Sequence, residues 1–410
     1  MRALEERTWW ARPGLEVRAG RLTVAGRDAE ALAREHGTPL YVHDLEHVRE
    51  QAQALSDALA EAGLRGVVRL ALKAQRDPEL LRFLRERAPF VGMDVCSPGE
   101  LRWALDHGWR ADEISYTGTN LSDRDLERIL PTEAHLNVDL LSQLERAGRQ
   151  APGRSVGLRM NPGIGATFAG GQETLYAGSG PTKFGILPDR LDEALEIAQR
   201  HRLVIDTVHY HSGYLYLNES IPVVEEAARR VAEMTRWLQA AGCPIAEVNT
   251  GGGLGVAFRP GDSPLDLTAW ASALARQLGP LGVAVGTEPG EFLVKGFGLH
   301  LAEVVTVEDR GGATFVGLDT GWNVANEHFV YDIPFHPILC RAADAEPLVP
   351  VTVSGNINEG NDLFAEDCAM PEIREGDILA FPNVGSYNGS MTSEHCLREP
   401  AKVLSLPDRI

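Results

Sequence analysis

The chain has 410 residues, of which 44% are hydrophobic and 24% are charged, and its formal net charge is −19. This length is too great for one average domain and suits two, each with a core of its own. The negative charge argues against nucleic acid and anionic membrane surfaces as partners.

Targeting and redox features point to a cytoplasmic protein. The longest apolar stretches are only of strand length, so no transmembrane helix is predicted. Residues 1–7 carry acids and lead to no apolar segment, which argues against a secretory signal. The five cysteines are scattered and form no Cys-x-x-Cys motif, a pattern typical of reduced thiols rather than of a disulfide or zinc framework.

The chain begins and ends with strand-like patterns. Residues 16–18 and 21–24 are predicted strands near the start. After about residue 295 strand-like runs predominate again, and they are 304–307, 314–318, 349–353, 378–381 and 401–404. We therefore predict a β-sandwich or β-barrel domain over residues 293–410, which residues 1–36 join.

Between these ends, from about residue 38 to 290, a short apolar run, a turn and a helical pattern alternate. The apolar runs are 40–42, 67–72, 90–95, 114–116, 136–138, 156–160, 204–208, 245–248 and 283–285. The helical patterns include 45–62, 79–86, 100–107, 187–201, 221–241 and 267–278. Roughly eight alternations predict an α/β fold, a TIM-like (β/α)₈ barrel over residues 37–292, with a doubly wound open sheet as the alternative.

Lys73 follows the apolar run 67–72 directly. Barrels of this kind place their active sites at the carboxyl ends of the strands. Burial there would lower the pKa of the amine and leave it neutral, able to form a Schiff base. A surface lysine at the end of a strand is the alternative, because single lysines are seldom catalytic.

Two further strand ends carry groups that suit a phosphorylated pyridine. Gly251, Gly252 and Gly253 follow one strand, and their backbone amides could hold a phosphate. Glu288 closes the next strand, where a carboxylate could keep a pyridine nitrogen protonated. A tight turn with positive φ and an ordinary Pro-Gly turn are the alternatives.

His209 and His211 end another strand of the same predicted barrel, and Asp94 and Arg159 lie at further strand ends. One of the two imidazoles could stack on a planar ring, although a strand histidine is more often structural. Asp94 and Arg159 could also be solvated charges or an internal ion pair. Each signal is weak alone, but together they gather at one end of one barrel and match the needs of pyridoxal 5′-phosphate (PLP).

With these residues in view, the sequence resembles the fold-type III PLP-dependent decarboxylases, the group of diaminopimelate, ornithine and arginine decarboxylases. The resemblance runs from about residue 38 to the C-terminus. The blocks that carry it are Ala71–Ala74, Met93–Leu101, Leu158–Gly163, Lys183–Ile186, His209–Gly213, Gly251–Gly255, Glu288–Gly290, His336–Ile338 and Gly385–Met391.

The resemblance implies a role for each matching residue. Lys73 would hold PLP as a Schiff base, His211 would stack on its ring and Glu288 would pair with its nitrogen. The remaining cofactor contacts would come from Asp94, Arg159, Gly251, Gly252, Gly253 and Tyr387, with the glycines and Tyr387 at the phosphate. The resemblance also implies a homodimer that shares its active sites and a small amino-acid substrate.

The sequence departs from the family pattern at four places. Asn358, next to Glu359, stands where the family has a proton-donating cysteine, and an amide cannot donate a proton as a thiol does. Glu291 replaces an arginine of the Glu-Pro-Gly-Arg block, and Tyr214 replaces a serine that contacts phosphate. A second substrate-binding arginine, expected near residues 326–328, is missing.

We therefore expect a decarboxylase whose catalytic residues are Lys73, His211, Asn358 and Glu359. Loss of two arginines disfavours diaminopimelate, whose distal carboxylate would have no partner, and Glu291 and Glu359 favour a basic or modified side chain. A racemase, an epimerase or a decarboxylative oxidative deaminase is the alternative. A PLP-binding regulator without turnover is a further one.

Overall fold

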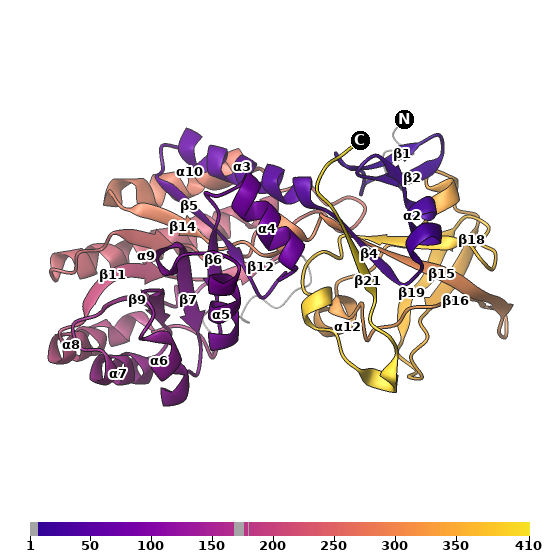
Figure 1. The fold of residues 1–410 in the computed structure, drawn as a ribbon. Coiled ribbons are helices and arrows are strands. Elements are labelled where there is room, and N and C mark those ends of the chain that lie inside the picture. The colour runs from indigo at the N-terminus through magenta and orange to yellow at the C-terminus, as the bar shows by residue number, and fades with distance from the viewer. Residues whose placement is uncertain (1–6, 168–175, 179) are drawn as a thin grey trace. The chain divides into compact units, whose positions relative to one another are not determined.

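The computed structural model describes residues 7–167, 176–178 and 180–410, and the chain forms two compact units. The first, called the barrel unit here, comprises Gln51–Val256 and Ser263–Phe292. The second, called the β unit, comprises Met1–Glu50, Ala257–Asp262 and Leu293–Ile410. Figure 1 shows the barrel unit in violet through magenta to light orange and the β unit in indigo, orange and yellow. In the described part of the chain, no helix has both the length and the apolarity needed to cross a membrane.

Eight parallel strands close the barrel in the order β11-β13-β14-β5-β6-β7-β8-β9. Each arises from one of the apolar runs predicted between residues 67 and 285, so the TIM-like barrel is confirmed and the open sheet is excluded. The strands are β5 (Gly66–Ala71), β6 (Gly92–Val95), β7 (Ile114–Gly118), β8 (His135–Val138), β9 (Ser155–Arg159), β11 (Val204–His209), β13 (Glu247–Asn249) and β14 (Ala284–Thr287).

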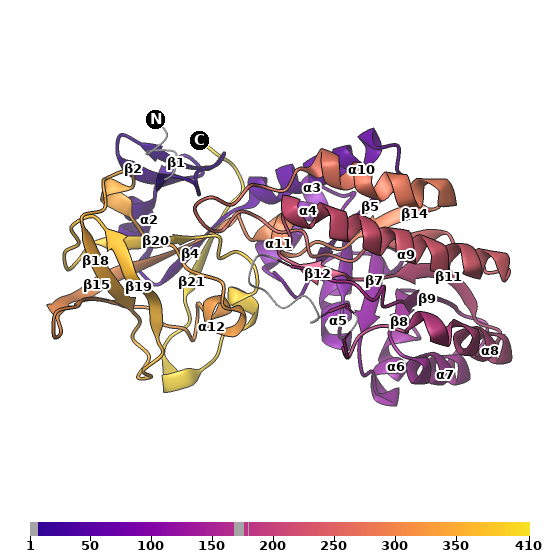
Figure 2. The ribbon, with the colours of Figure 1, turned by 180° about the vertical axis from the view of Figure 1, so that it is seen from behind.

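Helices follow the strands and surround them, as Figure 2 shows. They are α3 (Leu45–Glu61), α4 (Pro78–Arg87), α5 (Pro98–Asp106), α6 (Asp123–Ile129), α7 (Leu141–Gln150), α8 (Leu191–His201), α9 (Ile221–Ala240), α10 (Leu267–Leu278) and α11 (Glu291–Val294). The side chains of Asp77 and Ser97 accept hydrogen bonds from backbone amides of the first turns of α4 and α5, and a proline follows each cap. The short helices α6 and α7 were not predicted.

Part of the barrel's interior is polar. Arg69 on β5 forms two hydrogen bonds with Glu247 on β13, at 2.6 and 3.0 Å. Small residues make room for such groups: a Cβ atom on Gly286 would lie 2.1 Å from Oε1 of Glu247, and one on Gly157 would lie 2.0 Å from Oδ1 of Asn137. Charged and amide side chains therefore occupy part of the barrel's interior, where apolar residues are usual.

The β unit is a curled mixed sheet in the order β17-β20-β15-β16-β18-β19, with β4 paired to β15 and β21. Its strands are β4 (Leu40–Asp44), β15 (Gly298–Asp309), β16 (Thr314–Leu318), β17 (Ile338–Leu339), β18 (Val349–Ser354), β19 (Leu363–Met370), β20 (Ile378–Pro382) and β21 (Lys402–Leu406). A small sheet of β1 (Leu15–Arg18), β2 (Arg21–Val24) and β3 (Arg27–Asp28) and the helices α2 (Ala29–His36) and α12 (Glu327–Tyr331) complete it.

One predicted barrel run belongs to this unit instead. Residues 40–42 were expected to begin the barrel, but they form β4, which pairs antiparallel with β15 and parallel with β21. All five residues of β4 are buried. An apolar run with both faces covered looks the same in either sheet, so the sequence pattern could not separate the two.

Candidate active site

Lys73 lies two residues beyond the end of β5, between the buried residues Leu72 and Ala74, and its own side chain is exposed. The surroundings of Lys73 shift its pKa in the direction opposite to the one predicted. Desolvation lowers the pKa of the amine, but the nearby acidic groups of Asp94, Cys96 and Tyr176 together outweigh it, and the pKa is raised. The predicted lowering of the pKa of Lys73 is therefore not found in the chain without its cofactor, where these neighbours favour the protonated amine.

Asp94 and Arg159, the charged residues of β6 and β9, are both 7% exposed. Oδ1 of Asp94 has no hydrogen-bond partner among the described residues, and burial together with the charge of Glu288 raises the pKa of Asp94 well above its usual value. Nε of Arg159 lies 3.8 Å from Oδ1 of Asp139, and its guanidinium lies 4.3 Å from the ring centroid of Phe184. Both charges belong to the interior and neither is a solvated surface group.

Glu288 follows β14 and is 5% exposed. Its Oε2 lies 3.0 Å from Nε2 of His209, and its Oε1 accepts a hydrogen bond of 2.5 Å from Nδ2 of Asn249. Burial opposes ionisation, but His209 and then Arg69 outweigh it and bring the pKa of Glu288 to about 2. Glu288 is thus a stable anion, suited to a cationic partner such as a protonated pyridine nitrogen.

The glycine turn after β13 is packed directly against His211. The Gly252 N–H donates to Nδ1 of His211 at 3.1 Å, which leaves the proton of a neutral imidazole on Nε2. Burial and the charge of Arg159 lower the pKa of His211 well below its usual value. Gly251 and Gly253 have φ of +66° and +101°, and a Cβ atom on Gly251 would lie 2.8 Å from Nδ1 of His211. Only glycine fits this turn.

Tyr176 was not predicted, although it links several of the predicted residues. Its ring meets those of His211 and Tyr214 edge to face, with centroids 4.9 and 5.6 Å away. Its electrostatic neighbours include Lys73 and the buried carboxylate of Glu291. It lies in a long segment between β9 and α8 that carries no periodic pattern, so no local signal could have found it.

Asn249 was also missed as a site residue, and His209 was considered only as an alternative to His211 for stacking on a ring. Each ends a barrel strand two residues before a residue that was selected. A rule that treats every polar residue at the carboxyl end of a barrel strand as a candidate site residue would have included both.

Three predicted site residues lie in the β unit. Asn358 and Glu359 are exposed in the turn between β18 and β19, where Oε1 of Glu359 lies 3.2 Å from Nε2 of His395. Tyr387 follows β20 with φ of +57°, a strained value for a residue with a side chain. The structure gathers the other ten predicted residues in the barrel unit, and these three in the β unit.

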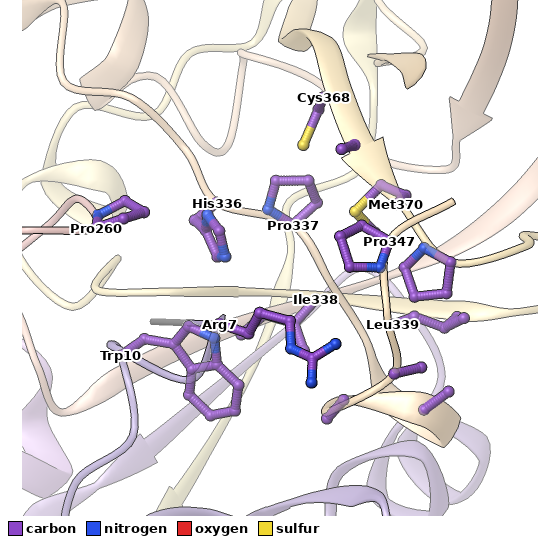
Figure 3. A pocket seen from close by; sticks show the side chains of 15 residues that line it. Arg7, Trp10, Pro260, His336, Pro337, Ile338, Leu339, Pro347, Cys368 and Met370 are labelled. Atoms are coloured by element: carbon purple, nitrogen blue, oxygen red, sulfur yellow. The ribbon is translucent and has the colours of Figure 1, made fainter. Parts of the chain in front are cut away.

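A cavity of about 200 Å³ within the β unit contains none of the predicted site residues (Figure 3). Its lining is mainly apolar and includes Trp10, Ile338 and Met370, with Arg7 and His336 as its basic groups. Burial lowers the pKa of His336 to about 4, so the ring is neutral. The cavity lacks the acid, amine and glycine turn that gather in the barrel.

The barrel residues fit PLP on the chemistry of their atoms. They offer a reachable amine at Lys73, a buried anion at Glu288, an unpartnered buried oxygen on Asp94 and a glycine turn too close to its neighbours for any side chain. A buried polar atom without a protein partner is free to accept a hydrogen bond from a bound ligand or a water molecule.

Comparisons with known proteins agree with this fit. Residues 45–295 match the family described as pyridoxal-dependent decarboxylase, pyridoxal binding domain. Diaminopimelate decarboxylases of Methanothermobacter thermautotrophicus and Escherichia coli are 34% and 32% identical, over 96% and 89% of this chain and 92% and 87% of theirs. The crystal structure of diaminopimelate decarboxylase from Helicobacter pylori complexed with L-lysine is similar, with a TM-score of 0.82, 26% identity and coverage of 92% of this chain and 93% of that one.

Proposed function

Because the chain belongs to the PLP-dependent amino-acid decarboxylase family, we propose that it removes the α-carboxylate of an amino acid with a cationic or modified distal group. The observation that carries the proposal is Glu291, 7% exposed at the start of α11 and an electrostatic neighbour of Tyr176. A carboxylate in that place attracts an ammonium or guanidinium group and repels a second carboxylate.

The barrel residues divide the work among them. Lys73 would hold the cofactor covalently and, once released, would carry a proton near Cα of the substrate. Glu288 would stay anionic opposite the ring nitrogen, His211 would cover the ring face, and the amides of the glycine turn would hold the phosphate, a role that the family resemblance also implies for Tyr387. When bound, PLP supplies an electron sink for the pair left on Cα as CO₂ departs.

The return of a proton to Cα is the step in which this chain departs from its family. We infer that Asn358 takes the place of the proton-donating cysteine, with Glu359 beside it. Since an amide does not donate a proton, the donor would be Lys73 or water. Slow or unselective protonation at Cα is the expected consequence.

Diaminopimelate is the second candidate substrate, and the names of the relatives favour it. The two candidates differ at the distal end, where diaminopimelate carries a carboxylate beside its ammonium group. A cationic partner for that carboxylate would have to come from a residue other than 291.

A mass-spectrometric screen in D₂O tests the proposal. The PLP-loaded protein would meet ornithine, lysine, arginine, diaminopimelate and their D-forms, with Lys73→Ala as the control. We expect loss of CO₂ and gain of one deuterium at Cα from a basic amino acid. Turnover of diaminopimelate alone would overturn the substrate proposal, and deuterium gained with the carboxylate retained would indicate a racemase or epimerase. If PLP is attached covalently to Lys73 but none of the amino acids is turned over, the protein would be a PLP-binding regulator.

We also propose a cytoplasmic homodimer with shared active sites, as the family resemblance implies. All five cysteines are free, in keeping with a reducing compartment. Mixing two inactive variants, Lys73→Ala and Glu359→Ala, would restore part of the activity if the sites are shared between copies. Sedimentation as a monomer with no restored activity would contradict the assembly.

A further inference from the structure

Asn249, the last residue of β13, bridges the two parts of the candidate site that differ most in chemistry. Its side chain is 1% exposed. Nδ2 donates to Oε1 of Glu288 at 2.5 Å, and Oδ1 accepts the N–H of Gly251 at 2.9 Å. One buried amide therefore connects the carboxylate after β14 with the first glycine of the turn.

The two partners determine how the amide must point. A backbone N–H can only donate and a carboxylate can only accept, so the residue between them needs an acceptor and a donor on the same side chain. Asparagine supplies both at a fixed spacing. Aspartate would keep the bond to Gly251 but lose the one to Glu288, and leucine, of similar size, would lose both.

Backbone bonds extend the bridge to a third strand. The carbonyl of Asn249 accepts the N–H of Tyr210 at 2.8 Å, and the carbonyl of Gly251 accepts the N–H of Glu288 at 2.8 Å. Tyr210 lies between His209, which pairs with Glu288, and His211, which accepts from Gly252. The carboxyl ends of β11, β13 and β14 are thus held as one rigid cluster around Asn249.

We propose that Asn249 is a positioning residue that sets the spacing between the glycine turn and Glu288, and so adapts the site to a phosphorylated pyridine over an unphosphorylated one. The inference rests on the proposed function, in which the turn holds the phosphate and Glu288 meets the ring nitrogen. Asn249 acts through both neighbours: it orients the Gly251 amide and keeps the carboxylate of Glu288 in place.

Titration of the apoprotein with PLP and with pyridoxal, which lacks the phosphate, tests the proposal. We expect Asn249→Leu to weaken PLP binding about tenfold or more, and pyridoxal binding less, because the turn is no longer held. Asn249→Asp keeps the acceptor for Gly251, so it should keep the preference for PLP.

Thr235→Val on α9 is the control, since it removes a different buried hydrogen bond of the same unit, from Oγ1 to the carbonyl of Val231. It should leave both affinities unchanged. Equal losses for PLP and pyridoxal in Asn249→Leu, or loss of the preference for PLP in Asn249→Asp, would overturn the inference. Failure of the wild-type protein to bind PLP would overturn the proposed function instead, and the Asp variant keeps the test open if the Leu variant does not fold.

Discussion

The Lys295–Glu327 pair of the β unit and the candidate site of the barrel unit bury charged side chains in different ways. In the β unit, Lys295 and Glu327 are each 1% exposed, and Nζ of Lys295 lies 2.7 Å from both carboxylate oxygens. Asn388 donates from Nδ2 to Oε2 of Glu327 at 3.2 Å and accepts the N–H of Glu327 at 2.9 Å. Every charge of this pair has its partners inside the protein.

The barrel unit leaves comparable groups incomplete. Oδ1 of Asp94, Oδ2 of Asp139 and Nδ1 of His209 are buried and have no hydrogen-bond partner among the described residues. A fully paired buried charge holds its own neighbourhood together, whereas an incomplete one costs stability unless a ligand supplies the missing partner. Unpartnered atoms of described residues also occur in the β unit, among them Oδ1 of Asp44 and Nδ1 of His300, so the contrast is between this one ion pair and the candidate site and not between the two units as wholes.

The largest effect on function should come from Lys73→Met. Without the amine the cofactor has no covalent attachment, so turnover should fall on the order of a thousand-fold or more. The melting temperature of the apoprotein should change little, because the Lys73 side chain is exposed. CO₂ release and mass spectrometry after borohydride treatment measure the first effect, and calorimetry measures the second. Retained turnover would remove Lys73 from the site.

The largest effect on stability should come from Lys295→Met. The substitution leaves the carboxylate of Glu327 in the interior without its counter-ion, which should lower the free energy of unfolding by about 3–5 kcal/mol. The double variant Lys295→Met/Glu327→Leu removes both charges and should regain most of that loss. Denaturant unfolding of the wild-type protein and both variants, followed separately in each unit, would measure these changes in the free energy of unfolding. Equal losses in the single and double variants would mean that the pair does not act as a pair.

Glu288→Gln should alter the response to acid. Because the pKa of Glu288 is lowered from 4.5 to about 2, its ionised form contributes stability that is complete above about pH 4.5 and is lost as the pH falls towards 2. Glutamine does not titrate, so the variant's acid-unfolding curve should be flatter in that window. Circular dichroism between pH 2 and 6 provides the comparison, and parallel curves for the two proteins would contradict it.

The smallest effect should come from Arg229→Ala. Arg229 pairs with Glu226 at 2.7 Å on the exposed surface of α9, and its side chain is 44% exposed. Solvent and salt screen such pairs, so neither the melting temperature nor the turnover should change measurably. A clear loss of melting temperature or turnover would show that this exposed pair matters to the protein, as the buried charges do.

Much of the fold could be predicted because strands and helices leave local patterns. Eight apolar runs became the barrel strands, and Asp77 and Ser97 cap the helices α4 and α5. The strand β19 was missed because its sequence, LFAEDCAM, carries acids and six of its eight residues are half-buried or exposed. The helices α6 and α7 were not among the predicted helical patterns, and α6 is only 7 residues long.

The candidate site could be predicted only in part. Lys73, Asp94, Arg159, His211 and Glu288 were found because polar residues at strand ends interrupt an apolar pattern. Their partners were not, since Tyr176 lies outside any pattern. The sign of the shift in the pKa of Lys73 was also wrong, because it depends on an acid from the neighbouring strand.

The sequence by itself therefore determined the alternation of strands and helices and the residues that meet at the barrel's carboxyl end, since both follow from local periodicity. Only the tertiary structure decided which atoms pair there. Glu288 meets Asn249 from 39 residues away and His209 from 79 residues away. It also decided that β4 belongs to the β unit. Such contacts depend on side-chain geometry between distant strands, which no local pattern encodes.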